Sequence, residues 1–215
     1  MNPLMSRRCA LAAMAAGVAS AALPTAAQSA GPRTRTDDGH AVEVVEGVLS
    51  DAGHWQLLQS INAVRQMVLD GKISPRGKDI KQVKRDSALA VEALQVVKTH
   101  KMQHVIASDP RWGWIGQNLY LARTSVAGPQ EKRTVEDAVT SWAAERKNFI
   151  YPAQSVDGKA VGNYTQLVWA QSEWVGGAYS YFRDLGSPSL PYTHLLAVNF
   201  GPGGNSVGQA PYTRA

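Results

Sequence analysis

Cysteine is almost absent from this sequence of 215 residues, since Cys9 is the only one. A domain formed by the residues after the N-terminal segment therefore has no disulfide and no cysteine nucleophile. The sequence also lacks a GxSxG nucleophile motif and a glycine-rich phosphate-binding loop. Its apolar stretch 10–23 is short and rich in alanine. We therefore expect no transmembrane segment in the mature chain.

A strong excess of one charge is lacking as well. The formal net charge is +5, and two of these charges belong to Arg7 and Arg8. This weak basicity, without any nucleic-acid-binding motif, predicts that the protein does not bind nucleic acid. The basic stretch 72–85 is interpreted as a solvated surface, with contact to anionic lipid or cell wall as the alternative. A composition of 44% hydrophobic and 18% charged residues is typical of one globular domain.

The N-terminal segment has the pattern of an export signal. Arg7 and Arg8 precede the apolar stretch 10–23, and small residues follow up to Ala30. We interpret residues 1–30 as a signal peptide, which predicts a secreted or periplasmic protein; the choice between the general and twin-arginine routes stays open. Residues 31–50 are polar and are predicted to be an N-terminal arm or linker, so that the domain comprises residues 51–215.

Helical spacing of apolar residues predicts two helices in the first half of the domain. The first has Asp51 as its expected N-cap and ends before Gly71. The second begins after Asp86 and carries His100 and His104 towards its C-terminal end. Imidazoles four residues apart on a helix share one face, so these two histidines are a candidate pair of ligands.

The sequence of the second half of the domain predicts one helix and the central strands of a sheet. A third helix is expected over residues 134–148, and Thr134 and Asp137 resemble a capping box at its start. β-Branched and aromatic residues bounded by glycine and turn residues predict strands. The predicted strands are 117–121, 162–169, 175–182 and 194–200.

Four ordered motifs in this chain resemble those of the CAP superfamily. The motifs are GQNL at 116–119, WAAE at 142–145, GNYTQLVWAQSEWVGGA at 162–178 and LLAVNFGPGGNSVGQAPY at 195–212. The superfamily comprises the cysteine-rich secretory proteins, antigen 5 and the plant pathogenesis-related proteins, which share an SCP-like extracellular domain. The resemblance implies an α+β fold, a three-layer α-β-α sandwich with a mainly antiparallel central sheet.

The resemblance also has a departure. Eukaryotic members of the superfamily are usually cross-linked, whereas this chain has other residues where cysteines would be expected. The positions concerned are Val156, Val161, Gly177 and Val198. This cysteine-free pattern favours a bacterial source.

The resemblance further implies a cleft with two histidines and two glutamates that can hold a divalent metal. Matched motif by motif, Glu145 is retained, Gln117 replaces the second acid and Asn163 replaces one histidine, while His104 stands for the other. Neighbouring motif residues become candidates for ligand contact or for the lining of the cleft. They are Asn118, Trp142, Tyr164 and Gln166.

Two amides among four positions predict a degraded site. Zinc prefers imidazole, thiolate and carboxylate ligands, and an amide does not titrate near neutral pH. We therefore expect no metal and no other cofactor; a zinc site formed by His100, His104 and Glu145 is the alternative. Glu145 lies three residues after Trp142 on the same apolar stripe, so it either lines a cavity or satisfies backbone N–H groups or an arginine within the core.

These observations favour a non-catalytic binding module over an enzyme. The expected ligand is small and apolar, of the lipid or sterol class, by analogy with relatives and with the apolar helices. Trp112, Trp114 and Trp174 are consistent with this interpretation but suit a core equally well. The alternatives are a metal-dependent hydrolase that uses His104 and Glu145, and a module that binds an extracellular protein or the cell wall. We expect a monomer.

Overall fold

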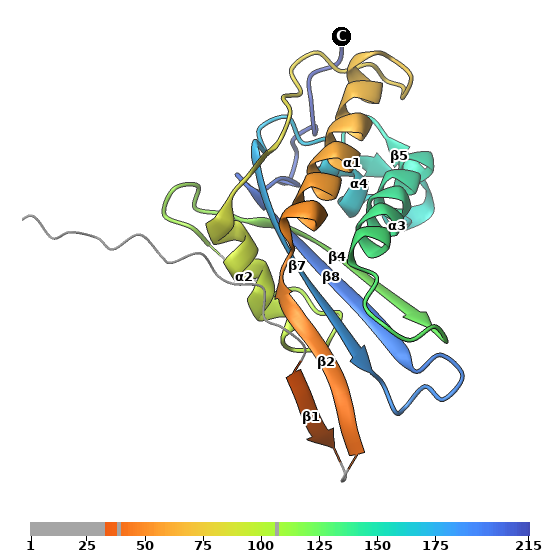
Figure 1. Ribbon diagram of the computed structural model, residues 1–215. Helices are drawn as coiled ribbons and strands as arrows, with labels where there is room; N and C mark the ends of the chain where they lie inside the picture. Colours follow the sequence, from red (N-terminus) through yellow and green to blue (C-terminus); the bar gives the residue numbers. More distant parts are fainter. Residues whose placement is uncertain (1–32, 38–39, 106–107) are drawn as a thin grey trace, which may run out of the picture.

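The computed structural model describes residues 33–37, 40–105 and 108–215. The predicted signal peptide, residues 1–30, lies outside this part of the chain. The centre of the fold is a sheet with the strand order β1-β2-β7-β8-β4 (Figure 1). The strands of this path pair antiparallel; their bounds are β1 Arg33–Asp37, β2 His40–Val48, β4 Gly116–Thr124, β7 Trp174–Arg183 and β8 Tyr192–Gly201. The short β3, Lys84–Arg85, adds a parallel pairing to the start of β7.

Helices cover both faces of the sheet. Helix α2, Ser87–Val97, lies on one face, and the other face carries α1, Asp51–Leu69, α3, Glu131–Ala144, and α4, Gly162–Leu167 (Figure 1). This arrangement confirms the α+β class and the α-β-α sandwich.

Two adjacent glycines of β7 allow helices to approach from both sides. A Cβ atom on Gly176 would lie 2.2 Å from the backbone nitrogen of Ala90 in α2. A Cβ atom on Gly177 would lie 2.6 Å from Leu49, next to α1. A larger residue at Gly176 would collide with the backbone of α2, and a larger residue at Gly177 would have to displace the Leu49 side chain.

Small elements connect α3 to α4. A 3-10 turn, η1, spans Glu145–Asn148, and a short hairpin pairs β5, Phe149–Ile150, with β6, Gln154–Ser155. A second 3-10 turn, η2, spans Val156–Gly158. These segments carry the chain from the end of α3 to the start of α4 on the same face of the sheet.

The prediction that residues 31–50 form an arm or linker is wrong for most of that segment. Strand β2 pairs with β7, so that Val44 lies opposite Phe182 and Val48 lies opposite Ala178. Val44 and Val48 are buried, whereas Glu43 and Glu46 supply the polar character that resembles a linker. The sheet therefore begins well before residue 51.

The predicted strand 162–169 is also wrong, because this segment forms helix α4. Its β-branched and aromatic residues favour a strand only as an average tendency, which tertiary contacts can override. The Thr165 Oγ1 atom lies 3.0 Å from the carbonyl oxygen of Val161, and the backbone N–H groups of Asn163 and Tyr164 in α4 donate to a side chain that is distant in sequence. The predicted strands 117–121, 175–182 and 194–200 are confirmed within β4, β7 and β8.

The predicted helix ends are only partly correct. Asp86 caps α2 as predicted, because its carboxylate accepts from the Leu89 N–H at 2.9 Å. Helix α1 is capped by Ser50 instead of Asp51, through a bond from the Gly53 N–H at 3.0 Å. Helix α3 begins at Glu131, so Thr134 lies within the helix and does not start a capping box.

Helix α2 ends at Val97, before the two histidines that were predicted to lie on it. The Thr99 N–H and hydroxyl both bond to the carbonyl oxygen of Val96, and His100 has a left-handed backbone with φ of 55°. His100 and His104 therefore do not share one helical face.

None of the helices in the described ranges is both long enough and apolar enough to cross a membrane.

Candidate functional site

Glu145 is the predicted site residue with the clearest role in the structure. It begins η1 directly after α3, and its Oε2 atom accepts from the backbone N–H groups of Asn163 at 2.9 Å and Tyr164 at 3.1 Å. Its Oε1 atom accepts from Nδ2 of Asn163 at 2.7 Å. The N-cap residue of α4, Val161, makes no side-chain cap bond. Glu145 therefore caps α4 from a distance, as carboxylates do at helix N-termini.

His104 and Gln117 form a second hydrogen-bonded pair. The Nδ1 atom of His104 lies 3.1 Å from Oε1 of Gln117, which also accepts from the Val105 N–H at 3.2 Å. The Gln117 Nε2 atom donates to Oδ1 of Asn199 at 3.0 Å. Since an amide oxygen only accepts, Nδ1 of His104 carries the hydrogen in this pair. His104 is exposed and Gln117 is half-buried.

The two pairs are linked by strand β4. Successive side chains of a strand point to opposite faces, and Gln117 reaches Asn199 whereas Asn118 reaches α4. Nδ2 of Asn118 donates to the carbonyl oxygen of Asn163 at 3.0 Å. The structure thus joins Glu145 to Asn163 and His104 to Gln117, with no hydrogen bond between these two pairs of side chains in the described part of the chain.

The remaining motif residues hold the fold together. Trp142 is buried and donates from Nε1 to the carbonyl oxygen of Leu119 at 3.0 Å. Buried Gln166 accepts from the Gly204 N–H at 2.8 Å and donates to Oγ of Ser172 at 3.0 Å. Tyr164 is buried, and its ring centroid lies 5.6 Å from that of Phe149.

The three-ligand site of His100, His104 and Glu145 does not form. The Nε2 atom of His100 lies 3.2 Å from a carboxylate oxygen of Glu46, and its ring stacks on Phe182 with centroids 4.4 Å apart. Among residues 33–37, 40–105 and 108–215, no group of three or more His, Cys, Asp or Glu side chains is placed to hold a metal ion. The side chains present therefore do not suit the divalent metal that such a cleft can hold, because Gln117 and Asn163 supply amides.

Sequence reasoning missed Arg65, a buried residue of α1 that contacts the segment after α4. Its guanidinium donates to the carbonyl oxygens of Leu167 at 2.7 Å, Ser172 at 2.8 Å and Trp169 at 3.1 Å, and also to that of Lys81. Burial lowers the pKa of Arg65 to about 9, which leaves it charged at pH 7. The signal was available, since Arg65 follows Ile61 by four residues on the buried stripe of α1.

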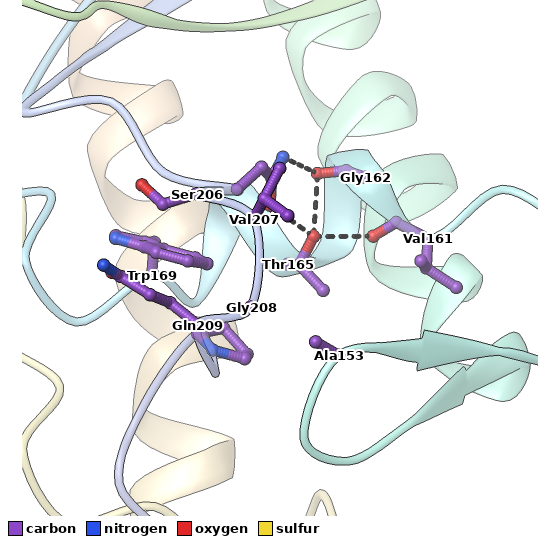
Figure 2. A pocket seen from close by; sticks show the side chains of 11 residues that line it. Ala153, Val161, Gly162, Thr165, Trp169, Ser206, Val207, Gly208 and Gln209 are labelled. Atoms are coloured by element: carbon purple, nitrogen blue, oxygen red, sulfur yellow. Dashed lines mark hydrogen bonds between the residues drawn. The ribbon is translucent and has the colours of Figure 1, made fainter.

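A cavity of about 350 Å³ lies beside α4 (Figure 2). Thr165 and Trp169 line one side, and the C-terminal loop with Val207 lines another. Val161 and Ala153 complete the walls from the segment before α4. The loop is attached to the helix because Oγ1 of Thr165 donates to Oδ1 of Asn205 at 2.6 Å. The cavity thus adjoins Gly162, the residue before Asn163.

Three tryptophans pack on glycines at the end of β8 and in the segment that follows it. A Cβ atom on Gly201 would lie 2.4 Å from the Trp112 ring, and one on Gly203 would lie 2.1 Å from Trp114. A Cβ atom on Gly204 would lie 2.6 Å from the ring of buried Trp169. These contacts set the shape of the loop that lines the cavity.

The fold and these motifs define the protein class. The sequence model of the CAP family, described as the cysteine-rich secretory protein family, matches residues 58–200. The chain belongs to this family. It is 34% identical over 147 residues to GLIPR1-like protein 1 of Bos taurus, covering 66% of this chain and 57% of that protein. It is 28% identical over 180 residues to venom allergen 5 of Microctonus hyperodae, covering 76% of this chain and 72% of that protein.

The chain spans only part of the length of these relatives, namely 57% of bovine and 58% of human GLIPR1-like protein 1.

Solved structures have a fold that resembles that of this chain. The crystal structure of NaASP2 with Zn2+ has a TM-score of 0.63 at 20% identity, covering 78% of this chain and 88% of that one. Na-ASP-1 has a TM-score of 0.65 at 21% identity, covering 78% of this chain and 43% of that one. These similarities support the sandwich fold and carry no further function.

Proposed function

We propose that this protein is an exported, non-catalytic binding module for a small apolar ligand of the lipid or sterol class. The observation that carries the proposal is the cavity of about 350 Å³ beside α4, which adjoins the pair Glu145–Asn163. Its walls include the apolar side chains of Ala153, Val161 and Trp169. Pockets for small ligands are usually largely apolar with a few polar groups, and Thr165 supplies such a group here.

Export is supported by the N-terminal sequence and by the relatives. Residues 1–30 have the pattern of a signal peptide. The relatives include a venom allergen and salivary antigens, names that describe proteins released from cells. We infer that this chain too acts outside the cytoplasm and works as a monomer.

The chemistry of Glu145, Gln117 and Asn163 supports a role in binding. The carboxylate of Glu145 accepts three hydrogen bonds within the fold, two of them from the backbone of α4. Using it in proton transfer would disturb the cap of that helix. The two amides Gln117 and Asn163 cannot act as acid or base near neutral pH.

The test is calorimetric titration of the exported chain with palmitate and with cholesterol sulfate. Ala153→Phe, which adds volume to a wall of the cavity, should weaken binding about tenfold because overpacking is unfavourable. Ala88→Phe is the matched control, since Ala88 is an exposed residue of α2 on the opposite face of the sheet. Equal affinity in both variants would place the ligand elsewhere, and no saturable binding of either probe would refute an apolar ligand.

A zinc titration of the same chain separates this proposal from the metal-dependent hydrolase that would use His104 and Glu145. His104 and Glu145 belong to separate hydrogen-bonded pairs, and their partners Gln117 and Asn163 are amides. We therefore expect weak zinc binding. Submicromolar zinc affinity that is lost in Glu145→Gln would contradict the proposed binding module.

A further inference from the structure

Three exposed apolar residues lie at one end of the sheet, on neighbouring strands. The register places Thr124 of β4 opposite Tyr192 of β8, and Tyr192 opposite Arg183 of β7. Two residues further out on these strands lie Val126, Leu190 and Leu185, respectively. Adjacent strands are about 5 Å apart, so the three residues project from neighbouring positions. Figure 1 shows the loops that carry them, 125–130 and 184–191, at the end of the sheet away from the C-terminus.

These two loops present an apolar surface with almost no charge. Val126 is 59% exposed, Leu185 50% and Leu190 43%. A single exposed apolar residue needs no explanation, whereas a group of them marks a contact surface. Asp184 is the only charged residue in either loop, and its carboxylate pairs with Arg123 of β4 at 3.3 Å. The end of the sheet formed by these loops therefore carries no uncompensated negative charge.

The backbone of both loops is largely hydrogen-bonded without water. In the loop 184–191, four N–H groups donate within the loop, namely those of Asp184, Gly186, Ser187 and Leu190. In the loop 125–130, the N–H groups of Val126, Gly128 and Gln130 donate to the hydroxyl oxygens of Thr124, Tyr181 and Tyr179. The prolines at 129, 188 and 191 have no N–H group. Since unpaired backbone groups are what an apolar environment penalises, these loops can leave water with little loss.

Two arginines lie directly behind the apolar residues. Arg183 is exposed and forms no ion pair with the residues that the structure describes. Arg123 is exposed as well, and its pair with Asp184 contributes little because it is open to solvent. The Arg123 guanidinium can therefore exchange that carboxylate for another anion. Long cationic side chains can extend along an apolar surface to reach lipid phosphates.

We propose that this end of the sheet docks on a lipid bilayer that contains anionic lipid. Val126, Leu185 and Leu190 would enter the boundary between headgroups and acyl chains, while Arg123 and Arg183 contact phosphates. A bilayer fits because it presents anions at its surface and hydrocarbon beneath, in the order in which the loops present cations and apolar side chains. The proposal goes beyond the apolar-ligand cavity and does not depend on it, because none of these five residues lines that cavity.

The test is sedimentation of the exported chain with vesicles of phosphatidylcholine, alone or mixed with phosphatidylglycerol. We expect saturable binding to the mixed vesicles that weakens as salt is added, and little binding to phosphatidylcholine alone. Leu190→Ser should weaken binding to mixed vesicles about fivefold, because less apolar surface enters the bilayer. Ile150→Ser is the matched control and should have no effect. It removes a side chain of the same size and similar exposure, 45%, from β5 at the other end of the molecule (Figure 1).

A second pair of variants tests the charge. Arg183→Gln should weaken binding to mixed vesicles about fivefold, as expected for one cation near an anionic surface. Lys78→Gln removes the same charge from an exposed position in the basic stretch 72–85 and should have no effect. A loss in Lys78→Gln without one in Arg183→Gln would place the contact on that stretch and overturn the proposal.

Three further outcomes would refute docking through these loops. They are equal affinities of Leu190→Ser and Ile150→Ser, equal binding to both kinds of vesicle, and no binding to mixed vesicles. The substituted side chains are all exposed, so each variant should fold, and its melting temperature verifies this before the vesicles are added.

Discussion

Single buried polar residues decide much of this structure. Arg65 contacts four backbone carbonyls and attaches α1 to the segment after α4. His54 is similarly buried, with Nδ1 2.9 Å from the carbonyl oxygen of Leu49 and Nε2 accepting from the Gly177 N–H at 3.4 Å. Both side chains join α1 to segments that are distant in sequence. Buried groups of this kind are costly to alter because their partners would be left unsatisfied.

His54 should make stability depend on pH. Burial, with a further contribution from Arg85, lowers the pKa of His54 to about 4, against 6.5 as the ordinary value. Between these values the unfolded chain binds a proton that the folded protein excludes, so stability is present above pH 6.5 and is lost as the pH falls towards 4. The difference corresponds to about 3 kcal/mol. Urea unfolding at pH 7 and at pH 4.5 measures it.

The control is His54→Gln, which removes the titrating group and keeps hydrogen-bonding ability. Other acidic groups titrate in both proteins, so only the difference between the two pH profiles reports on His54. The variant should be less stable at pH 7 and should show a flatter profile between pH 6.5 and 4. Parallel profiles would mean that His54 is protonated in the folded protein.

At the scale of elements, helix α4 depends on a side chain from another helix. It has six residues, too few to be stable alone, and its N-cap residue offers no side-chain acceptor. The Glu145 carboxylate at the end of α3 supplies that acceptor. The position of α3 therefore determines where α4 begins, and with it the wall of the cavity that Thr165 lines.

Glu145→Gln tests this cap. The neutral amide keeps one acceptor oxygen but loses the charge that strengthens the bonds to the Asn163 and Tyr164 N–H groups. We expect a loss of about 1–2 kcal/mol in the free energy of unfolding. Asn163→Ala removes only the side-chain bond to Glu145 and should cost less than Glu145→Gln. The reverse order, measured by urea unfolding, would show that the backbone cap is unimportant.

The pairing of strand β2 with β7 leads to a second prediction, on the effect of removing β2. A chain that begins at residue 31 keeps the pairing of β1 with β2 and of β2 with β7, whereas a chain that begins at residue 51 leaves the edge of β7 unpaired. Unpaired strand edges promote association. We expect the first chain to remain monomeric with a cooperative thermal transition and the second to aggregate or unfold, as seen by gel filtration and circular dichroism. A monomeric, cooperatively folding chain from residue 51 would show that β2 is dispensable.

The sequence predicts the elements whose own pattern is strong. Strands β7 and β8 are rich in β-formers, and Asp86 is a clear N-cap, so local rules suffice for them. Helix α4 and strand β2 could not be found in this way. The first is held by Glu145 from outside its own sequence, and the second becomes a strand through its pairing with β7. The motifs singled out His104, Gln117, Glu145 and Asn163 as candidates, whereas the hydrogen-bond partners of these residues required the structure.

At the scale of the whole molecule, stability comes from packing without covalent cross-links. Two buried clusters lie on the two faces of the sheet, the larger beneath α1, α3 and α4 and the smaller beneath α2. Since Cys9 is the only cysteine, no disulfide can form within one chain. We therefore expect an excess of thiol reductant to leave the melting temperature unchanged, measured by calorimetry. A decrease on reduction would contradict this and would indicate a cross-link between chains through Cys9.

The contacts between the tryptophans and the glycine segment have a consequence for how such a sequence can change over time. Gly201 and Gly204 have no space for a Cβ atom because the rings of Trp112 and Trp169 occupy it, and at Gly203 the space is taken by the Trp114 ring together with the Gly116 backbone. A substitution of the glycine alone causes a clash, and a substitution of the tryptophan alone leaves a void. The two residues of each pair therefore restrict each other's substitution during evolution. Related chains should therefore exchange glycine and tryptophan at these positions together, and the loop beside α4 should diverge in steps of paired substitutions.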